Sequence, residues 1–180
     1  MSGIPAALQT PILPDLLANG LTLVFCGTAA GAISAAKGEY YAHPQNKFWR
    51  VLRDVELIPR DFNSARWREL LEFGIGLTDI AKYASGMDHQ LARGSLGADA
   101  IAGLKERIRE VQPKILAFTS LTGGGKFLGT KAVVGEQSER IGATRIWILP
   151  SPSAAARRYW DEKIWRALAK EVRAASTGSA

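Results

Sequence analysis

The chain has 180 residues, of which 47% are hydrophobic and 22% charged, a balance typical of one compact domain that excludes a wholly disordered chain. Lysines and arginines outnumber aspartates and glutamates by 23 to 17, which gives a formal charge of +6 and an isoelectric point near 9.7. This charge favours a polyanionic partner, although an ordinary basic surface explains it equally well.

The chain lacks the marks of a secreted, zinc-stapled or membrane protein. Its single cysteine, Cys26, has no partner for an internal disulfide, and no Cys/His cluster has the spacing of a zinc site. No apolar run approaches the roughly 20 residues that cross a bilayer, and residues 1–14 do not have the pattern of a signal peptide. We therefore expect a cytoplasmic protein with no structural metal and no membrane partner.

Short apolar runs rich in β-formers predict strands, which in chain order are 21–27, 114–119, a weaker candidate at 131–134, and 145–150. Amphipathic patterns predict helices, one starting near Phe48 after the Pro44-Gln45-Asn46 turn, one over 101–111 and one over 161–172. Pro113 ends the second helix just before a strand begins.

This alternation predicts an α/β fold, a three-layer α/β/α sandwich with a short, mainly parallel central sheet. We assign residues 15–173 to a single domain, between an N-terminal tail over 1–14 and a C-terminal tail over 174–180 that is expected to fray. Ligands of such sheets bind beyond the carboxyl ends of the strands. The site is therefore expected in the segments that follow the strands.

Three segments carry residues suited to chemistry. The first, 27–31, follows the first strand. The second, 38–49, places two tyrosines, a histidine, a proline turn and an amide within a dozen positions, enough for a flat slot that suits a planar heterocycle. In the third, 149–160, small residues permit close approach to a phosphate backbone, and Arg157 and Arg158 supply charge, unless they are ordinary exposed charges at a helix start.

Together these segments resemble the mismatch-specific uracil-DNA and thymine-DNA glycosylase family, within the uracil-DNA glycosylase superfamily, over roughly residues 20–170. The strongest match runs from Phe25-Cys26-Gly27 to Phe48-Trp49, where the family shows a pattern like FCGINPG…SA…G…(F/Y)A(H/G)P…N.FW. A second match, 140–150, precedes the family's NPSG…R loop. The string Tyr40 to Asn46 is also similar to the hypoxanthine-DNA glycosylase branch.

The resemblance implies a uracil-DNA glycosylase-like fold and a monofunctional DNA repair hydrolase that flips uracil, or another deaminated base, out of DNA and cleaves its N-glycosidic bond. It implies DNA as the partner and no cofactor, and nothing suggests more than a monomer. Two roles carry over from the resemblance: Tyr41 as the stacking ring, or else a core aromatic, and Arg157 as the loop arginine. We also assign to the base pocket the turn of Gly27, Thr28, Ala29 and Gly31, whose backbone N–H groups can meet the oxygens of the base, together with Ser151. The other residues assigned to DNA contact are Pro152, Ser153, Ala155 and Arg158.

The chain departs from the family pattern at three positions. Ala29 stands where the family has the asparagine of GINPG, which positions the attacking water. Ser151 stands where the loop begins with asparagine, and Ala155 stands at the wedging leucine. The usual residue that holds water is therefore absent, so catalysis is either relocated or lost.

Four residues are candidates for the missing role: Asp79, Glu39, Asn46 and His43. A carboxylate or amide near the sugar can orient water and favour an oxocarbenium-like cation, and a histidine can donate to the departing base. Each also has a structural interpretation. These are a helix N-cap for Asp79, a solvent-facing loop acid for Glu39, a cap of the Phe48 helix for Asn46 and a packed turn histidine for His43.

The glycine run at 122–126 lacks the spacing of a nucleotide P-loop. It indicates a flexible loop whose Lys126 touches a DNA phosphate, or a plain surface turn. Two other functions stay open for the whole chain. A catalytically weak or inactive protein that binds DNA damage or abasic sites fits the missing asparagine, and a hydrolase of free nucleosides fits less well, given the basic charge and the arginine loop.

Overall fold

A computed structural model describes residues 9–178; the outermost parts of both predicted tails, 1–8 and 179–180, lie outside this range. Its centre is a five-stranded sheet in the order β2, β1, β3, β5, β4. The strands are β1 (Leu23–Gly27), β2 (Ile75–Asp79), β3 (Ile115–Phe118), β4 (Gly135–Ile141) and β5 (Thr144–Ile148). Every neighbouring pair is parallel except β4 with β5.

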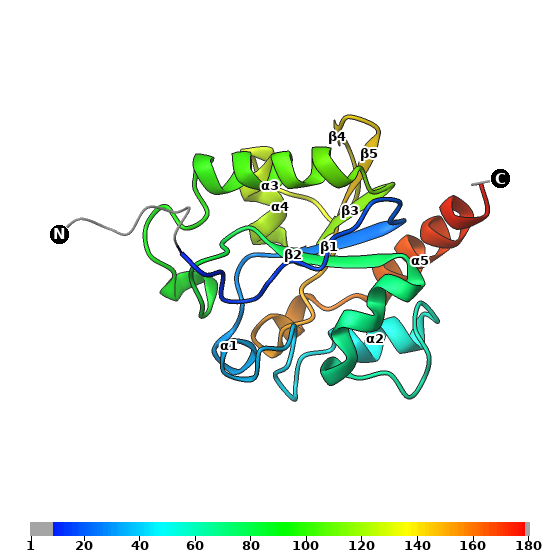
Figure 1. The fold of residues 1–180 in the computed structure, drawn as a ribbon, viewed down its shortest axis with the longest axis horizontal. Helices are drawn as coiled ribbons and strands as arrows, with labels where there is room; N and C mark the ends of the chain where they lie inside the picture. Colours follow the sequence, from blue (N-terminus) through cyan, green and yellow to red (C-terminus); the bar gives the residue numbers. More distant parts are fainter. Residues whose placement is uncertain (1–8, 179–180) are drawn as a thin grey trace.

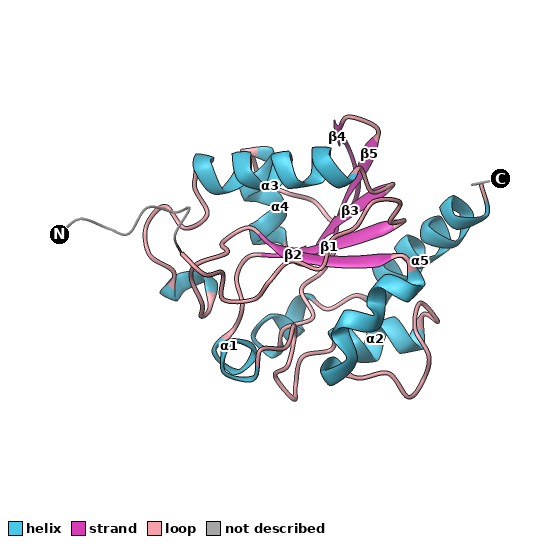
Figure 2. Ribbon diagram, in the orientation of Figure 1, coloured by secondary structure: helices cyan, strands magenta, loops and turns pink. Residues whose placement is uncertain are grey.

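Helices cover both faces of the sheet (Figure 1). On one face lie α3 (Ala98–Val111) and α4 (Leu121–Leu128), and on the other lie α1 (Ala32–Lys37), α2 (Phe48–Asp54), the 3₁₀ helix η2 (Ser64–Phe73) and α5 (Glu162–Thr177). Two short 3₁₀ turns, η3 (Asp88–Gln90) and η4 (Ala154–Tyr159), belong to loops. The predicted three-layer α/β/α sandwich on a mainly parallel sheet is confirmed (Figure 2). Within residues 9–178, no helix has both the length and the apolar character needed to cross a membrane.

The interior strand β1, which lies between β2 and β3, is buried on both sides because both faces of the sheet are covered. Leu23 and Phe25 pack in the larger core with residues of α2 and α5, whereas Val24 and Cys26 pack in the smaller core with residues of α3 and α4. Burial on both faces explains the unbroken apolar run that predicts this strand.

The strands predicted over 21–27, 114–119 and 145–150 correspond to β1, β3 and β5, and the predicted helices correspond to α2, α3 and α5. The strand predicted at 131–134 is wrong. The edge strand is instead β4, whose mostly exposed polar residues form no apolar run and whose pairing with β5 is interrupted by an irregularity between Glu136 and Arg140. β2 escapes prediction because Gly76, Thr78 and Asp79 break the apolar pattern of a strand that is fully buried.

The glycine run at 122–126 is helical, so the expected loop or turn is wrong. Ser120 caps α4 by accepting a hydrogen bond from the N–H of Gly123 (3.0 Å). Gly124 lies so close to β5 that a Cβ on it would overlap with the side chain of Ile148. The glycines therefore permit close packing of helix on sheet, and Lys126 lies exposed on the same helix.

The segment before β1 packs along the outer edge of β2. Leu16 forms an antiparallel bridge with Leu77, and Leu13 is only 2% exposed. This packing brings Asp15, the first residue of the predicted domain, beside the end of β2. At the other end of the chain, α5 continues to Thr177, so residues 174–177 are helical where fraying was expected.

Gly124→Ala is expected to lower the free energy of unfolding by about 1 to 3 kcal/mol, because the added methyl group meets Ile148 in a packed core. Gly103→Ala, in α3, is the matched control. A Cβ there makes only an ordinary contact, 3.5 Å from Arg107, so helix propensity should raise the free energy of unfolding by up to about 1 kcal/mol. Urea unfolding followed by circular dichroism measures both. Equal stabilities of the two variants would contradict the packing role of Gly124.

Candidate functional site

The carboxyl ends of the parallel strands place polar groups along one edge of the sheet. β1 ends at Gly27 and β2 at Asp79, Thr119 directly follows β3, and Ser151 lies shortly after β5. Parallel α/β sheets bind their ligands at this edge. The candidate site therefore lies along this edge.

Gly27 and Asp79 are register partners in neighbouring strands. A Cβ at position 27 would stand 2.5 Å from Oδ1 of Asp79 and 3.4 Å from the hydroxyl of Tyr41. A residue larger than glycine would therefore push the carboxylate away. Glycine at the end of β1 lets the carboxylate and the tyrosine hydroxyl approach the same point.

Tyr41 is held as a fixed wall of the site. Its φ is +51°, a left-handed conformation that is uncommon for a residue with a side chain and is found where the surroundings impose it. Its ring stacks on Phe48, with centroids 3.8 Å apart and planes 18° apart, and its hydroxyl lies 3.1 Å from Oγ1 of Thr119. Burial raises the pKa of the Tyr41 hydroxyl well above its ordinary value, so the hydroxyl stays neutral.

Asp79 is the buried acid of this edge. The residue is 4% exposed. Among residues 9–178 no donor forms a hydrogen bond with its carboxylate, and the carboxylate oxygens are not among the fully enclosed unpaired side-chain atoms, so they retain contact with solvent. Burial raises the pKa of Asp79 from 3.8 to about 6; Lys82 and Arg107 oppose this rise, whereas Asp15 adds to it. The N-cap interpretation of Asp79 is wrong, because the residue ends a strand. A largely buried carboxylate with a raised pKa and no donor from its own protein is a functional candidate.

The turn after β1 offers unpaired backbone donors. The N–H of Ala81 donates to the carbonyl of Thr28 (2.8 Å), and the Thr28 hydroxyl donates to the carboxylate of Asp88 (2.5 Å). Among residues 9–178 no acceptor pairs with the backbone N–H of Thr28 or of Ala29. Gly31 then forms the N-cap of α1. Free N–H groups in a fixed turn are suited to bind the oxygen atoms of a ligand.

The other three catalytic candidates are engaged in local structure. Glu39 accepts a hydrogen bond from a serine hydroxyl at the start of η2 (2.9 Å). Asn46, one residue before the N-cap Lys47 of α2, accepts the N–H of Phe48 (2.9 Å). His43 is exposed, and its Nδ1 accepts a backbone N–H within its own turn (3.1 Å). A cleft of about 420 Å³ is lined by His43 and Asn46 together with Tyr41.

The loop after β5 meets the segment that carries these residues. The N–H of Lys47 donates to the carbonyl of Pro152 (2.9 Å), and the ammonium of Lys47 lies 4.8 Å from the ring centroid of Trp160. Ser151 accepts the N–H of Ser153 (3.2 Å). The two loops that the sequence assigns to base and DNA contact therefore lie side by side.

η4 continues this loop as an exposed cationic turn. Ser153 caps it by accepting the N–H of Ala155 (3.3 Å). Arg157 and Arg158 are both exposed, and Tyr159 is 73% exposed. These side chains are free to meet a partner at the edge of the sheet.

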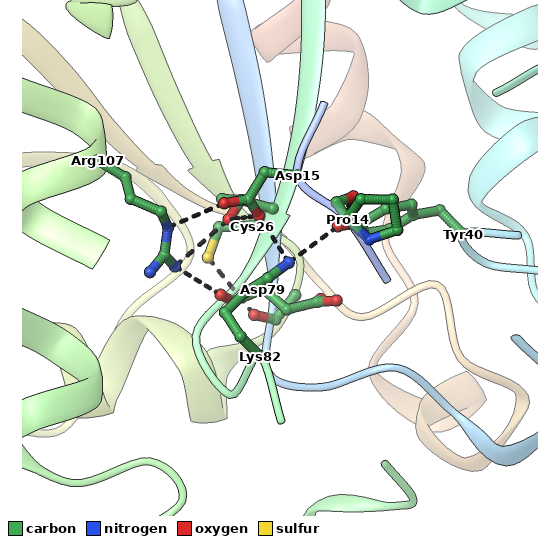
Figure 3. A network of polar contacts seen from close by, with 9 residues as sticks. Pro14, Asp15, Cys26, Tyr40, Asp79, Lys82 and Arg107 are labelled. Atoms are coloured by element: carbon green, nitrogen blue, oxygen red, sulfur yellow. Dashed lines mark hydrogen bonds and ion pairs between the residues drawn. The ribbon is translucent and has the colours of Figure 1, made fainter. Parts of the chain in front are cut away.

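Sequence reasoning missed the residues around Asp79, which are drawn in Figure 3. Asp15 lies at the boundary of a supposed tail, and Lys82 looks like an ordinary loop charge. One signal pointed to Arg107. It lies three positions after Leu104 and one before Ile108, so it adjoins the buried stripe of α3, where a charge needs a partner.

The assembled groups are a buried acid, a fixed ring and unpaired N–H groups, at the edge of a sheet flanked by exposed arginines. Within residues 9–178, no cluster of three or more His, Cys, Asp or Glu side chains is placed to hold a metal ion. The structure brings together Gly27, Asp79 and Tyr41 and keeps Glu39 and His43 in local contacts of their own. The chemistry available here is therefore that of an acid, backbone donors and a stacking surface.

A family model described as the Uracil DNA glycosylase superfamily matches residues 14–169. The chain belongs to this superfamily. The match includes all five strands, the turn after β1, Tyr41, Asp79 and η4. The predicted superfamily is thereby confirmed.

A solved structure shares the fold of this glycosylase-superfamily chain. It is the solution NMR structure of a protein described as a "putative Uracil DNA glycosylase" from Methanosarcina acetivorans. The TM-score is 0.59 at 22% sequence identity, over 89% of this chain and 96% of that chain. At this identity the likeness concerns the arrangement of sheet and helices.

Asp79→Asn is expected to stabilise the protein at pH 7 to 8 by on the order of 2 kcal/mol. The folded chain raises the pKa of Asp79 from 3.8 to about 6, so an ionised carboxylate at neutral pH opposes folding. Below pH 6 the folded wild type takes up a proton and recovers this stability, so the difference between variant and wild type should shrink toward pH 4. Urea unfolding at several pH values measures this; a variant less stable than wild type at pH 7 would contradict it.

Proposed function

We propose that this protein is a DNA glycosylase that removes uracil from DNA, with the Asp79 carboxylate in the role that an asparagine fills elsewhere in the family pattern. The observation that carries the proposal is the carboxylate itself, buried and without a donor, beside the turn that the superfamily match includes. A group that costs stability and satisfies nothing in the fold is explained by a ligand.

The reaction needs two opposite charges to be stabilised. As the C1′–N1 bond breaks, its electron pair passes to the base, and the sugar takes on oxocarbenium character. Ionised Asp79 stabilises the cationic sugar and orients a water whose oxygen bonds to C1′; the proton of that water passes to the carboxylate or to solvent. The departing base then takes a proton from solvent, so charge and atoms balance.

The flipped base is proposed to contact the Tyr41 ring and the backbone turn after β1. The Tyr41 ring, fixed by Phe48 and Thr119, is the proposed stacking surface for the flipped base. The free N–H groups of Thr28 and Ala29 are proposed to meet a base carbonyl oxygen on which negative charge develops. This pairing favours bases with such oxygens, namely uracil first and hypoxanthine second.

The DNA side of the site is the exposed turn after β5. Arg157, Arg158 and, from α4, Lys126 supply cations for backbone phosphates. Ala155 is too small to fill the space of an extruded base, and exposed Tyr159 is the large side chain on the same turn. Unpairing costs least at a mispair, so G·U sites should be preferred. We further propose that the protein acts on DNA as a monomer in the cytoplasm.

Wild-type protein is expected to convert a duplex with one uracil opposite guanine into alkali-cleavable strands. Asp79→Ala should slow single-turnover excision by about 100-fold or more, because it removes the charge that faces the cationic sugar. Glu39→Ala, Asn46→Ala and His43→Ala should each stay within about tenfold of wild type. Gel analysis after alkali measures all of them, with a hypoxanthine duplex in parallel.

Two outcomes of this assay would contradict the proposal. Full turnover by Asp79→Ala would remove the carboxylate from the reaction. Binding of the duplex by the wild type without strand breaks would favour the second candidate function, a protein that binds damaged or abasic DNA without cleaving it. The observation that favours this second function is Ala29, whose side chain cannot hold a water as asparagine does.

Arg157→Ala and Arg158→Ala should each weaken DNA binding and reduce the slope of log K against log salt by about 1, because each lost phosphate contact retains one counterion. Lys170→Ala, an exposed cation on α5, is the control and should leave the slope unchanged. Fluorescence anisotropy with a labelled duplex at several salt concentrations measures the slopes. Equal slopes for all variants would place the DNA elsewhere.

A further inference from the structure

Behind Asp79 lies a largely buried charge cluster made of Asp15, Lys82 and Arg107 (Figure 3). Asp15 is its centre, with the Lys82 ammonium at 2.6 Å and Nε of Arg107 at 3.3 Å. The Thr78 hydroxyl also donates to Asp15 (2.7 Å). The Lys82 side chain is 9% exposed, and those of Asp15 and Arg107 are each 23% exposed. Charges this enclosed act on their neighbours with little screening by salt.

One contact connects the cluster to Asp79, and a second reaches Tyr40, whose ring centroid lies 6.2 Å from that of Tyr41. Nη2 of Arg107 donates to the backbone carbonyl of Asp79 (2.8 Å). The Lys82 ammonium donates to the hydroxyl of Tyr40 (3.3 Å), which donates in turn to the carbonyl of Pro14 (3.2 Å). The cluster therefore joins α3, the segment after β2 and the segment before β1 at the end of the strand that carries the acid.

We propose that Lys82 and Arg107 are positioning residues that keep Asp79 ionised, and that Asp15 moderates them by pairing with both. This inference rests on the proposed function, because it explains how the ionisation of the same carboxylate is set. The cluster carries two positive charges and one negative charge, so it leaves one net positive charge next to a buried acid. That surplus offsets part of the cost of ionising the acid away from water.

The other groups that face Asp79 are neutral. Burial raises the pKa values of the Cys26 thiol on β1 and of the hydroxyls of Tyr40 and Tyr41, so none of them carries charge at neutral pH. The hydroxyl of Thr119, after β3, does not titrate. The charges that act on Asp79 therefore come from the cluster, and with them in place the pKa of Asp79 is about 6.

The test is the pH dependence of single-turnover excision by the full chain on a uracil-containing duplex. The wild-type rate should fall on the acid side with a midpoint near pH 6. Lys82→Met removes a positive charge, so its midpoint should rise; Asp15→Asn removes a negative charge, so its midpoint should fall. Each shift should be about half a pH unit or more. Opposite shifts are the signature of a charge effect, because a merely structural defect lowers the rate without moving the midpoint.

Three further variants support this test. Lys82→Arg keeps the positive charge and should keep the wild-type midpoint. Arg109→Met removes an exposed charge from the same helix as Arg107 and should move nothing. Arg107→Gln should raise the midpoint, and it replaces Lys82→Met if that variant fails to fold, as judged by circular dichroism and melting at each pH.

Slower excision with an unmoved midpoint in the charge variants, or shifts in the same direction, would overturn the control assigned to the cluster while leaving the glycosylase proposal intact. A wild-type profile with no acid limb, or full activity of Asp79→Asn, would overturn the role of Asp79 itself. The two failures are therefore distinguishable in one set of measurements.

Discussion

The site depends on one unfavourable burial, that of Asp79: the residue is 4% exposed, and its carboxylate has no hydrogen-bond donor in residues 9–178. Burial alone favours its neutral form. The surrounding structure makes room for it through the missing side chain of Gly27, and two cations oppose its neutralisation. A fold that only had to be stable would have an apolar residue here.

The fold tolerates the burial of Asp79 because the rest of the sheet is closely packed on both faces. Two separate cores, one on each face, enclose the central strands, and Gly124 lets α4 approach β5 at the distance of direct contact. The strained backbone of Tyr41 is held in the same way, by a stacked ring and a hydroxyl contact at its two ends. Rigid packing thus holds the acid and the ring in place without help from a ligand.

Much of the fold follows from the sequence, because unbroken apolar runs and helical periodicity mark β1, β3, β5, α2, α3 and α5. Two strands do not follow: β2 ends in the polar residues that the site uses, and β4 is an exposed edge with no apolar run. The glycines of α4 suggest a loop, because their close packing against Ile148 joins residues far apart in the chain and cannot be seen in the local sequence. Within the site, the motif indicates Gly27 and Tyr41, but single sequence positions cannot rank Asp79 above Glu39. Only the fold shows that Glu39 faces a serine and Asp79 faces no donor.

The sheet also bears on how copies of the chain meet. Beyond β2, the segment around Leu16 covers one outer edge through its bridge to Leu77. At the opposite edge, β4 carries Glu136, Glu139 and Arg140, and its irregular pairing interrupts the regular ladder. Charged or covered edges discourage another strand from adding to a sheet. Both outer edges of this sheet are thereby protected against edge-to-edge association of copies of the chain.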